Sequence, residues 1–260
     1  MQAGAVQQRY VVQFFAQLRH SFAQLVRTPS QSQRKQAARK LARHSLLLTA
    51  ILSSSIIALM FFFDAREIAL MPARGSPDLW PVRILTDFGK DEYVLWPLAA
   101  MLIVIALTSP ALAATRRARW LHFGTRVQYL FLAVLVPVLA TEVIKWAVGR
   151  GRPFVGGNAN PFNFVPFTGT EAYFSFPSAH AATGFALASS VGALWPRARP
   201  WMLLYAVLIA MSRLVLLAHH PSDVVAGALI GILGAMAVRY WFAARQLGFA
   251  IDADGKIVPL

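Results

Sequence analysis

Cysteine is absent from the 260-residue sequence, and charged residues make up only 14% of it. Without cysteine there can be no disulfide framework. Hydrophobic residues make up 57% of the chain and the mean hydropathy is +0.52, whereas soluble domains average roughly 45–50% apolar and about 25% charged residues. This composition excludes a disordered chain and is atypical of a soluble domain. It is typical of a protein embedded in a membrane.

Charge is missing above all from six parts of the chain. A hydrocarbon core about 30 Å thick requires about 20 helical residues to cross it. Six runs of about that length are uncharged or carry a charge only near one end: 46–63, 93–114, 127–148, 177–195, 201–218 and 224–242. The first run starts too far into the chain to be the apolar core of a cleaved secretory signal. The sequence therefore predicts an all-α fold, a polytopic bundle of six transmembrane helices.

Acidic residues are also scarce, 11 against 25 basic residues, which gives a net charge of +14. Counted by side, 17 basic residues fall on the side that holds both termini and eight on the other side. Because basic residues are enriched on the cytoplasmic side of membrane proteins, both termini are expected in the cytoplasm. Nine of the 11 acidic residues fall on the opposite, outer side. The positive charge therefore reflects membrane topology, and we expect no nucleic-acid partner.

The predicted spans divide the chain into three parts. Residues 1–45 form a cytoplasmic N-terminal segment, 46–244 the membrane domain and 245–260 a cytoplasmic tail. An amphipathic helix is expected in the first part, where apolar residues recur every three or four positions: Val6, Tyr10, Val11, Phe14, Phe15, Leu18, Phe22, Leu25 and Val26. Such a helix either contacts a partner or, the interpretation we favour, lies on the inner leaflet among anionic headgroups. On the outer side, 79–88 is expected to form a short interfacial helix.

Polar residues gather at the outer ends of the predicted spans, in three groups. The first closes the third span, the second opens the fourth, and the third joins the fifth to the sixth: Lys145 and Arg152-Pro153; Pro177-Ser178-Ala179-His180; and Ser212-Arg213 with His219 and Asp223. Each group alone has an ordinary structural explanation, such as an interfacial anchor or a helix start. Together they place ionisable residues on one side of the bundle, which indicates a functional site.

The residue types in these groups suit a phosphate-binding site. Lys145, Arg152 and Arg213 offer three cations to one anion, and arginine can bind two phosphate oxygens at once. The proline of the second group suits the first position of the fourth helix. The backbone amides near Ser178 and Ala179, at the positive end of that helix, would then point at the same anion.

Two histidines beside these cations suit phosphoryl transfer. This reaction requires charge stabilisation, a nucleophile and an acid for the leaving oxygen. His219 suits the nucleophile, because Asp223 is available to hold its other ring nitrogen in the donor tautomer. His180 remains as the acid. No cluster of carboxylates is left for magnesium and no cysteine for zinc, so we expect metal-independent chemistry without a cofactor.

The order and spacing of the three groups resemble the signature of the type 2 phosphatidic acid phosphatase (PAP2) superfamily, in its membrane lipid phosphatase branch. The matching pattern reads Lys145-x6-Arg152-Pro153, Pro177-Ser178-Ala179-His180 and Ser212-Arg213-x5-His219-x3-Asp223. The motifs cover 145–223, and the six-helix layout extends the likeness to about 46–242. One departure is Ala179, where the family more often has glycine. Alanine keeps the backbone amide, so we expect activity to persist.

The resemblance implies a role for each matching side chain. It assigns phosphate binding to four of them, Lys145, Arg152, Ser178 and Arg213. It also implies that His180 protonates the leaving group, and that His219 forms a phosphohistidine while Asp223 orients it. The expected function is hydrolysis of a lipid phosphomonoester or diphosphate, with phosphatidic acid, phosphatidylglycerophosphate, prenyl diphosphate and lipid A phosphates as candidate substrates.

Two other functions remain open at this point. A lipid phosphotransferase would use the same intermediate and pass the phosphate to a second lipid. An anion transporter would use the basic cluster but has no need for two histidines, and it is the less favoured alternative. The resemblance further implies a bacterial-type inner membrane, with the site facing the periplasm and the outer leaflet. The sequence does not define an oligomeric state.

Overall fold

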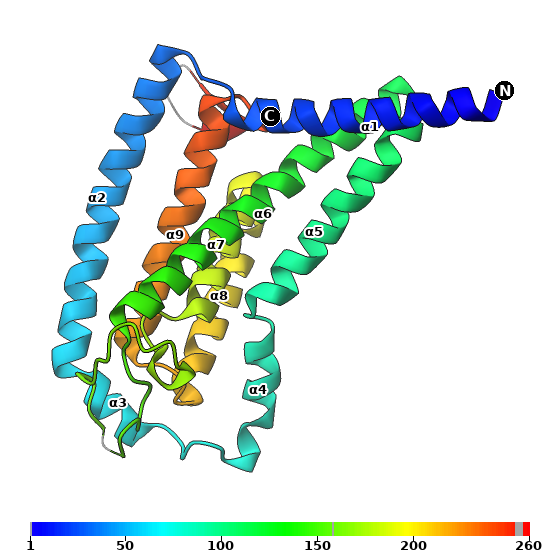
Figure 1. The fold of residues 1–260 in the computed structure, drawn as a ribbon. Coiled ribbons are helices and arrows are strands. Elements are labelled where there is room, and N and C mark those ends of the chain that lie inside the picture. The colour runs from blue at the N-terminus through cyan, green and yellow to red at the C-terminus, as the bar shows by residue number, and fades with distance from the viewer. Residues whose placement is uncertain (1, 158, 253–256) are drawn as a thin grey trace.

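The computed structural model describes residues 2–157, 159–252 and 257–260, and it is predominantly helical (Figure 1). Its α-helices are α1 (Gln2–Val26), α2 (Gln31–Phe62), α3 (Asp64–Leu70), α4 (Trp80–Asp87), α5 (Asp91–Thr108), α6 (Ala114–Val148), α7 (Ala179–Leu194), α8 (Arg199–Val215) and α9 (Pro221–Ala244). Short 3-10 turns lie at Pro77–Leu79, Ser109–Ala111, Glu171–Tyr173 and Pro196–Ala198. Two short strands, β1 (Phe249–Ile251) and β2 (Ile257–Pro259), pair antiparallel near the C-terminus. The all-α prediction is confirmed apart from this small hairpin.

Within the described residues, five helical stretches are long and apolar enough to cross a membrane. They are α2, the stretch from Pro77 to Ala111 that contains α4 and α5, α6, the stretch from Pro196 to Val215 that contains α8, and α9. The expected fourth span corresponds to α7, which has 16 residues and is therefore about 24 Å long. Helix length alone thus does not establish the sixth span, although α7 packs against α6, α8 and α9.

Close packing between α7 and α9 fixes the centre of the bundle. A Cβ atom at Gly227 would lie 2.2 Å from the backbone oxygen of Ser178, and one at Gly231 would lie 2.3 Å from that of Ala182. Only glycine permits so close an approach of the two backbones at these positions. The start of α7 is therefore held against the first turns of α9, which brings the second and third predicted groups of polar residues together.

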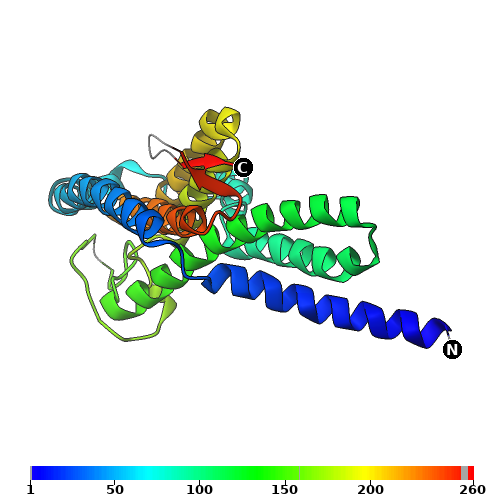
Figure 2. The same cartoon turned by 90° about the horizontal axis from the view of Figure 1, so that it is seen from above.

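The N-terminal helix α1 lies across one end of the bundle (Figure 1), and viewed from above it runs beside α5 and α6 (Figure 2). Hydrogen bonds tie it to the bundle: Tyr10 donates to the carbonyl of Leu107, and Trp241 donates to that of Leu25. Its exposed apolar side chains are Val11, Val12, Phe15, Leu18, Phe22 and Val26. The helix thus packs partly on its own chain and leaves an apolar face exposed.

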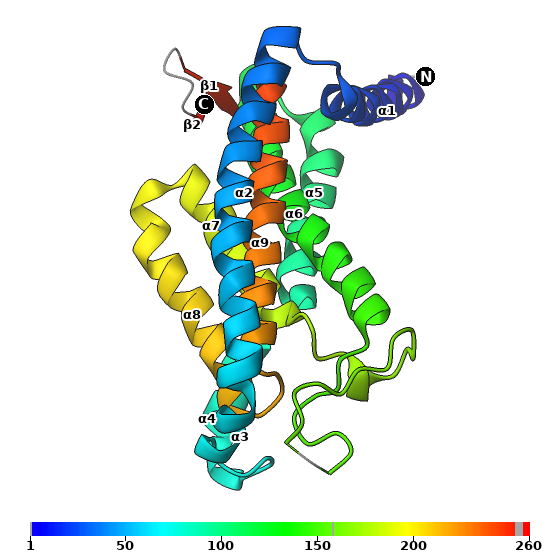
Figure 3. The ribbon, with the colours of Figure 1, turned by 90° about the vertical axis from the view of Figure 1, so that its left-hand side faces the viewer.

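The other segments outside the predicted spans also pack on the bundle. Helix α2 runs without a break through residue 45 and lies beside α9 (Figure 3). The C-terminal hairpin buries Phe249 against Tyr129 of α6, with 4.7 Å between their ring centroids. The end of the bundle opposite α1 carries α3, α4 and the long 149–178 connection (Figures 1 and 3). Helix α4 corresponds closely to the short helix expected at 79–88.

Candidate active site

A backbone carbonyl fixes the orientation of His219, in the turn between α8 and α9. The imidazole is buried, and its Nδ1 lies 2.7 Å from the carbonyl oxygen of Ser175. A carbonyl oxygen can only accept a hydrogen bond, so Nδ1 carries the proton. The other ring nitrogen, Nε2, then holds a free lone pair, as a nucleophile requires.

Asp223 acts on His219 less directly than the sequence suggested. Its Oδ2 lies 3.9 Å from Nδ1 of His219, which is too long for a hydrogen bond. The same oxygen accepts from the hydroxyl of Ser175 at 2.6 Å and from the backbone amide of His220 at 2.8 Å. The other oxygen, Oδ1, pairs with Arg150 at 2.5 Å. The carboxylate thus holds Ser175, and Ser175 in turn holds the histidine.

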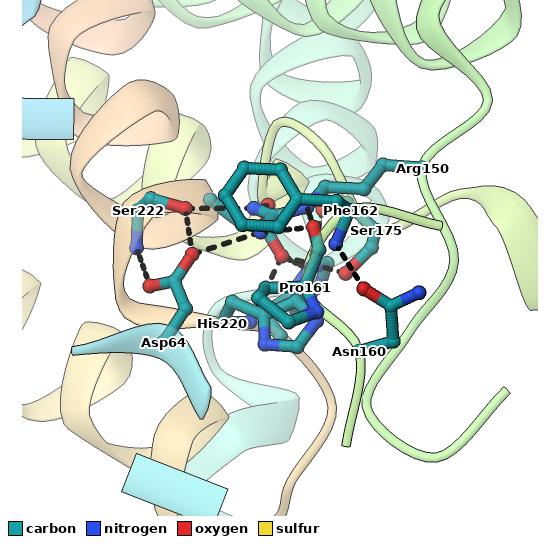
Figure 4. A network of polar contacts seen from close by, with 10 residues as sticks. Asp64, Arg150, Asn160, Pro161, Phe162, Ser175, His220 and Ser222 are labelled. Carbon is teal, nitrogen blue, oxygen red and sulfur yellow. Dashed lines mark hydrogen bonds and ion pairs between the residues drawn. The ribbon is translucent and has the colours of Figure 1, made fainter. Parts of the chain in front are cut away.

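Arg150 lies at the centre of a fully buried polar network (Figure 4). Its guanidinium pairs with Asp223 and, at 2.8 Å, with Asp64 at the start of α3. It also donates to the hydroxyl of Ser222 and twice to the carbonyl of Pro161. The backbone amide and hydroxyl of Ser222 both donate to Asp64. The network therefore joins α3, the 149–178 connection and α9.

The three expected phosphate-binding cations have different surroundings. Lys145, in the last turn of α6, is buried, and its Nζ lies 2.6 Å from the carboxylate of Glu142. Arg213, in the last turn of α8, donates from Nη1 to the hydroxyl of Thr86 at 2.8 Å. Nε of Arg152 is buried and has no hydrogen-bond partner among the described residues. Arg152 and Arg213 thus retain donors for a ligand.

The charges of all three cations act on His219. Burial is the main cause that lowers the pKa of His219 well below its usual value, and the charges of Arg213 and Arg152 lower this pKa further. The Ser175 carbonyl opposes this decrease in pKa, and Lys145 adds a smaller lowering effect. His219 is therefore neutral at physiological pH, which keeps the lone pair on Nε2 available.

The start of α7 differs in detail from the predicted helix start. The residue Ser178 is the N-cap and the helix begins at Ala179, so Pro177 precedes the helix and does not occupy its first position. The backbone amide of Ser178 donates to the carbonyl of Asp223 at 3.0 Å and is not free for an anion. The amides of the first helical turn, beginning with Ala179, have no intrahelical acceptor and remain available.

Two buried side-chain atoms at the start of α7 are without partners in the part of the chain that the structure describes. They are the hydroxyl of Ser178 and Nε2 of His180. Buried polar atoms usually find hydrogen-bond partners, so unpartnered ones indicate a place for a ligand or water. The positive charges of Arg213, Lys145 and Arg152 also act on His180. The start of α7 therefore faces the same cationic cluster as His219.

Sequence reasoning missed the residues that support this arrangement. Asp64, Arg150, Ser175 and Ser222 were not predicted as site residues, and neither was Thr86, which holds Arg213. Their partners lie far apart in the chain, so no local spacing reveals the pairs. The available signal was weak: an acid directly after the first predicted span, and an arginine two residues before a motif arginine.

Comparison with known proteins identifies the family. The family model of the PAP2 superfamily matches residues 126–247. The chain is 31% identical over 208 residues to the lipid A 1-phosphatase of Rhizobium johnstonii, covering 78% of this chain and 82% of that protein. It is 32% identical to the lipid A 1-phosphatase of Rhizobium etli, covering 66% and 75%, and 36% identical to the decaprenylphosphoryl-5-phosphoribose phosphatase of Mycolicibacterium smegmatis, covering 63% and 80%. The chain therefore belongs to the PAP2 superfamily, in its membrane lipid phosphatase branch.

Proposed function

We propose that this protein removes phosphate from a membrane lipid through a phosphohistidine at His219, without a metal ion. One observation carries the proposal. His219 is buried, its Nδ1 donates to the carbonyl of Ser175, and the positive charges of three side chains act on its ring: Arg213, Arg152 and Lys145. Charge stabilisation and positioning are the main requirements of phosphoryl transfer. The proposed substrate is a phosphomonoester or diphosphate of a lipid, the class on which the named relatives act.

In the first step, the cations Lys145, Arg152 and Arg213 bind the phosphate oxygens. Nε2 of His219 then attacks phosphorus, so that a P–N bond forms and the bond to the lipid oxygen breaks. The negative charge of the bound phosphate favours the protonated form of His180 against burial and the nearby cations. His180 then donates its proton to the leaving oxygen, which prevents an alkoxide from accumulating. The positive charge that develops on His219 is balanced by the carboxylate of Asp223, 3.9 Å from its ring.

In the second step, His180 accepts a proton from water and returns to its acidic form. The resulting hydroxide attacks phosphorus, the P–N bond breaks, and inorganic phosphate leaves. The same cations stabilise the charge of both transition states. The first-turn amides of α7 and the hydroxyl of Ser178 supply further donors to the phosphate.

The membrane context explains why a lipid is the substrate class. Helices α6, α8 and α9 are long and apolar enough to cross a bilayer, and they carry site residues at the ends opposite α1. A headgroup bound there leaves its acyl or prenyl tails in the bilayer. We further propose that the membrane is a bacterial inner membrane and that the site faces the periplasm.

The test is phosphate release by purified protein from a panel of lipids. The panel contains lipid A 1-phosphate, a prenyl diphosphate, phosphatidic acid and phosphatidylglycerophosphate, and the assay is run with and without a chelator. We expect release from at least one lipid, undiminished by the chelator and abolished in His219→Ala. Phosphate that appears on a second lipid and not in water would show a phosphotransferase instead. Activity lost to the chelator and restored by magnesium would contradict the metal-independent mechanism.

A further inference from the structure

We infer that Arg150 and Asp64 are positioning residues, which set the orientation of the nucleophile His219 through Asp223 and Ser175. This inference rests on the proposed function, because it assigns a catalytic consequence to a network that does not touch the phosphate. Neither residue belongs to the three motif groups of the sequence. Figure 4 shows the network around Arg150.

The hydrogen bonds of Arg150 leave its guanidinium no alternative orientation. A guanidinium has five N–H groups in a rigid plane. Nη1 donates to Asp223 and Ser222, Nη2 donates to Asp64 and the carbonyl of Pro161, and Nε donates to the same carbonyl. All five N–H groups are thus occupied inside a site that solvent does not reach. Any rotation would leave a buried donor unpaired, which is costly.

The contacts of Asp223 carry this orientation to the histidine. Arg150 holds Oδ1, which leaves Oδ2 directed at the hydroxyl of Ser175 and the amide of His220. The carbonyl of Ser175 in turn accepts from Nδ1 of His219. The peptide of Ser175 is therefore fixed from the carboxylate side, and its position sets where Nε2 points.

Asp64 completes the chain by holding Arg150 from the other side. One carboxylate oxygen pairs with Nη2 of Arg150, and both oxygens accept from Ser222 next to Asp223. Replacing a buried ion pair by apolar residues is often neutral or favourable for stability, so stability alone does not explain such a network. Its geometry instead joins three segments, 64–70, 149–178 and 221–244, around the one imidazole that must be aimed at phosphorus.

The experiment compares turnover with anion binding in Arg150→Met and Asp64→Asn. Active sites are counted by titration with vanadate, which occupies the phosphate site, and turnover is expressed per site. We expect kcat to fall by about 10²-fold in both variants, the scale of a nucleophile misplaced by about 1 Å. The inhibition constant of inorganic phosphate should stay unchanged, because phosphate binds Lys145, Arg152 and Arg213 without bonding to Nε2, and these three residues are untouched. The matched control is Arg239→Met. Arg239 lies near the C-terminal end of α9 and donates to the carbonyl of Ile257, so its replacement should leave kcat at the wild-type value.

A second pair of variants keeps every charge in place, should the charged-residue variants fail to fold. Ser175→Ala removes only the hydroxyl that Asp223 holds, and it should lower kcat per vanadate site. Ser175→Thr restores a hydroxyl and should recover most of the rate. A purely structural role for the hydroxyl would reduce the number of folded sites and leave kcat per site unchanged.

The possible outcomes separate this inference from the proposed function. Wild-type protein that releases no phosphate from any lipid contradicts the proposed function, and the inference falls with it. An active wild type whose Arg150→Met and Ser175→Ala variants keep full kcat per site contradicts the inference alone. Equal losses of kcat and of affinity for inorganic phosphate also overturn it, because they would show damage to the whole phosphate site.

Discussion

At the scale of single residues, burial and one carbonyl give His219 the protonation state that the proposed nucleophile requires. The Ser175 carbonyl places the proton on Nδ1, and burial together with nearby cations keeps the ring neutral by lowering its pKa. A neutral imidazole has a lone pair on Nε2 whatever the charge of the incoming phosphate. Asp223 then acts mainly on the residues that hold the histidine, and its carboxylate remains near enough to stabilise positive charge on the ring.

His180 should be dispensable for the first step when the leaving group of the substrate needs no proton. We expect His180→Ala to lose about 10²–10⁴-fold in rate on the natural lipid, the usual contribution of a general acid. With nitrophenyl phosphate the first step should be restored, because nitrophenolate leaves unprotonated, whereas hydrolysis of the phosphohistidine should stay slow because His180 also activates the water. His219→Ala is the control, and it should be inactive on both substrates. The measurement is the burst of nitrophenolate in the first turnover, together with the initial rate of each variant on both substrates; a burst from His219→Ala instead would reverse the two roles.

Glu67 should make the stability of the protein depend on pH. It is buried in α3, and neither carboxylate oxygen has a hydrogen-bond partner among the described residues. Burial, with smaller contributions from Asp64 and Asp223, raises its pKa from 4.5 to about 7. As pH rises, the unfolded chain loses this proton before the native state does. The contribution of Glu67 to the free energy of unfolding therefore falls as pH rises from about 4.5 to about 7.

The variant Glu67→Gln should remove this dependence. At pH 5 we expect it to unfold close to the wild-type temperature. At pH 8 it should be more stable than wild type by up to about 3 kcal/mol, since one pKa unit corresponds to about 1.4 kcal/mol. The exposed Asp78→Asn is the control and should show the wild-type pH dependence. The measurement is the unfolding temperature of the protein in detergent micelles as a function of pH. Curves that run parallel for Glu67→Gln and wild type would contradict the raised pKa of Glu67.

At the scale of elements, close contact between α7 and α9 determines where the two halves of the site meet. The helix α9 carries Asp223 in its first turn, and α7 begins at Ala179 beside it. The glycines at 227 and 231 let the two backbones approach, so the site depends on residues that contribute no chemistry themselves.

Substituting Gly231→Ala should therefore destabilise the protein. The new Cβ would lie 2.3 Å from the backbone oxygen of Ala182, and a backbone atom cannot move aside as a flexible side chain can. We expect a loss of about 1–3 kcal/mol, the usual cost of overpacking, together with reduced activity. The control is Gly184→Ala, whose Cβ would meet its nearest neighbour at 3.6 Å. Equal unfolding temperatures for the two variants would show that the contact is not as close as described.

The elements and the site were predictable from the sequence to different extents. Apolar runs predicted α2, α5, α6, α8 and α9, because hydropathy is a local property. The shortness of α7 was missed, since 177 and 178 belong to the connection and cap that precede the helix. Motif spacing indicated His219 and Asp223, but their link through Ser175 depends on a contact between residues 44 positions apart. Arg150 and Asp64 were missed for the same reason.

At the scale of the whole molecule, the charge distribution predicts how the chain sits in the membrane. The side that holds α1 carries 17 basic residues, and the side that holds the site carries eight. Because the chain lacks cysteine, single introduced cysteines can report this orientation. Position 159 belongs to the 149–178 connection and position 32 to the start of α2, two segments at opposite ends of the molecule (Figure 1). Both positions are exposed.

We expect Ala159→Cys to react with a membrane-impermeant maleimide once the outer membrane is permeabilised. Its counterpart Ser32→Cys should react only after the inner membrane is opened, and the cysteine-free wild type should not react at all. The opposite labelling order would place the site in the cytoplasm and contradict the topology.

Phosphate is proposed to pass through His219, and trapping the covalent enzyme tests this most directly. Purified wild-type protein is mixed with a lipid substrate labelled in its phosphate, and the reaction is quenched within one turnover. The protein should then carry label that is lost in acid and stable in base. His219→Ala should carry none, whereas His180→Ala with an activated substrate should still become labelled. Acid-stable label on the wild type, or label on His219→Ala, would contradict the account.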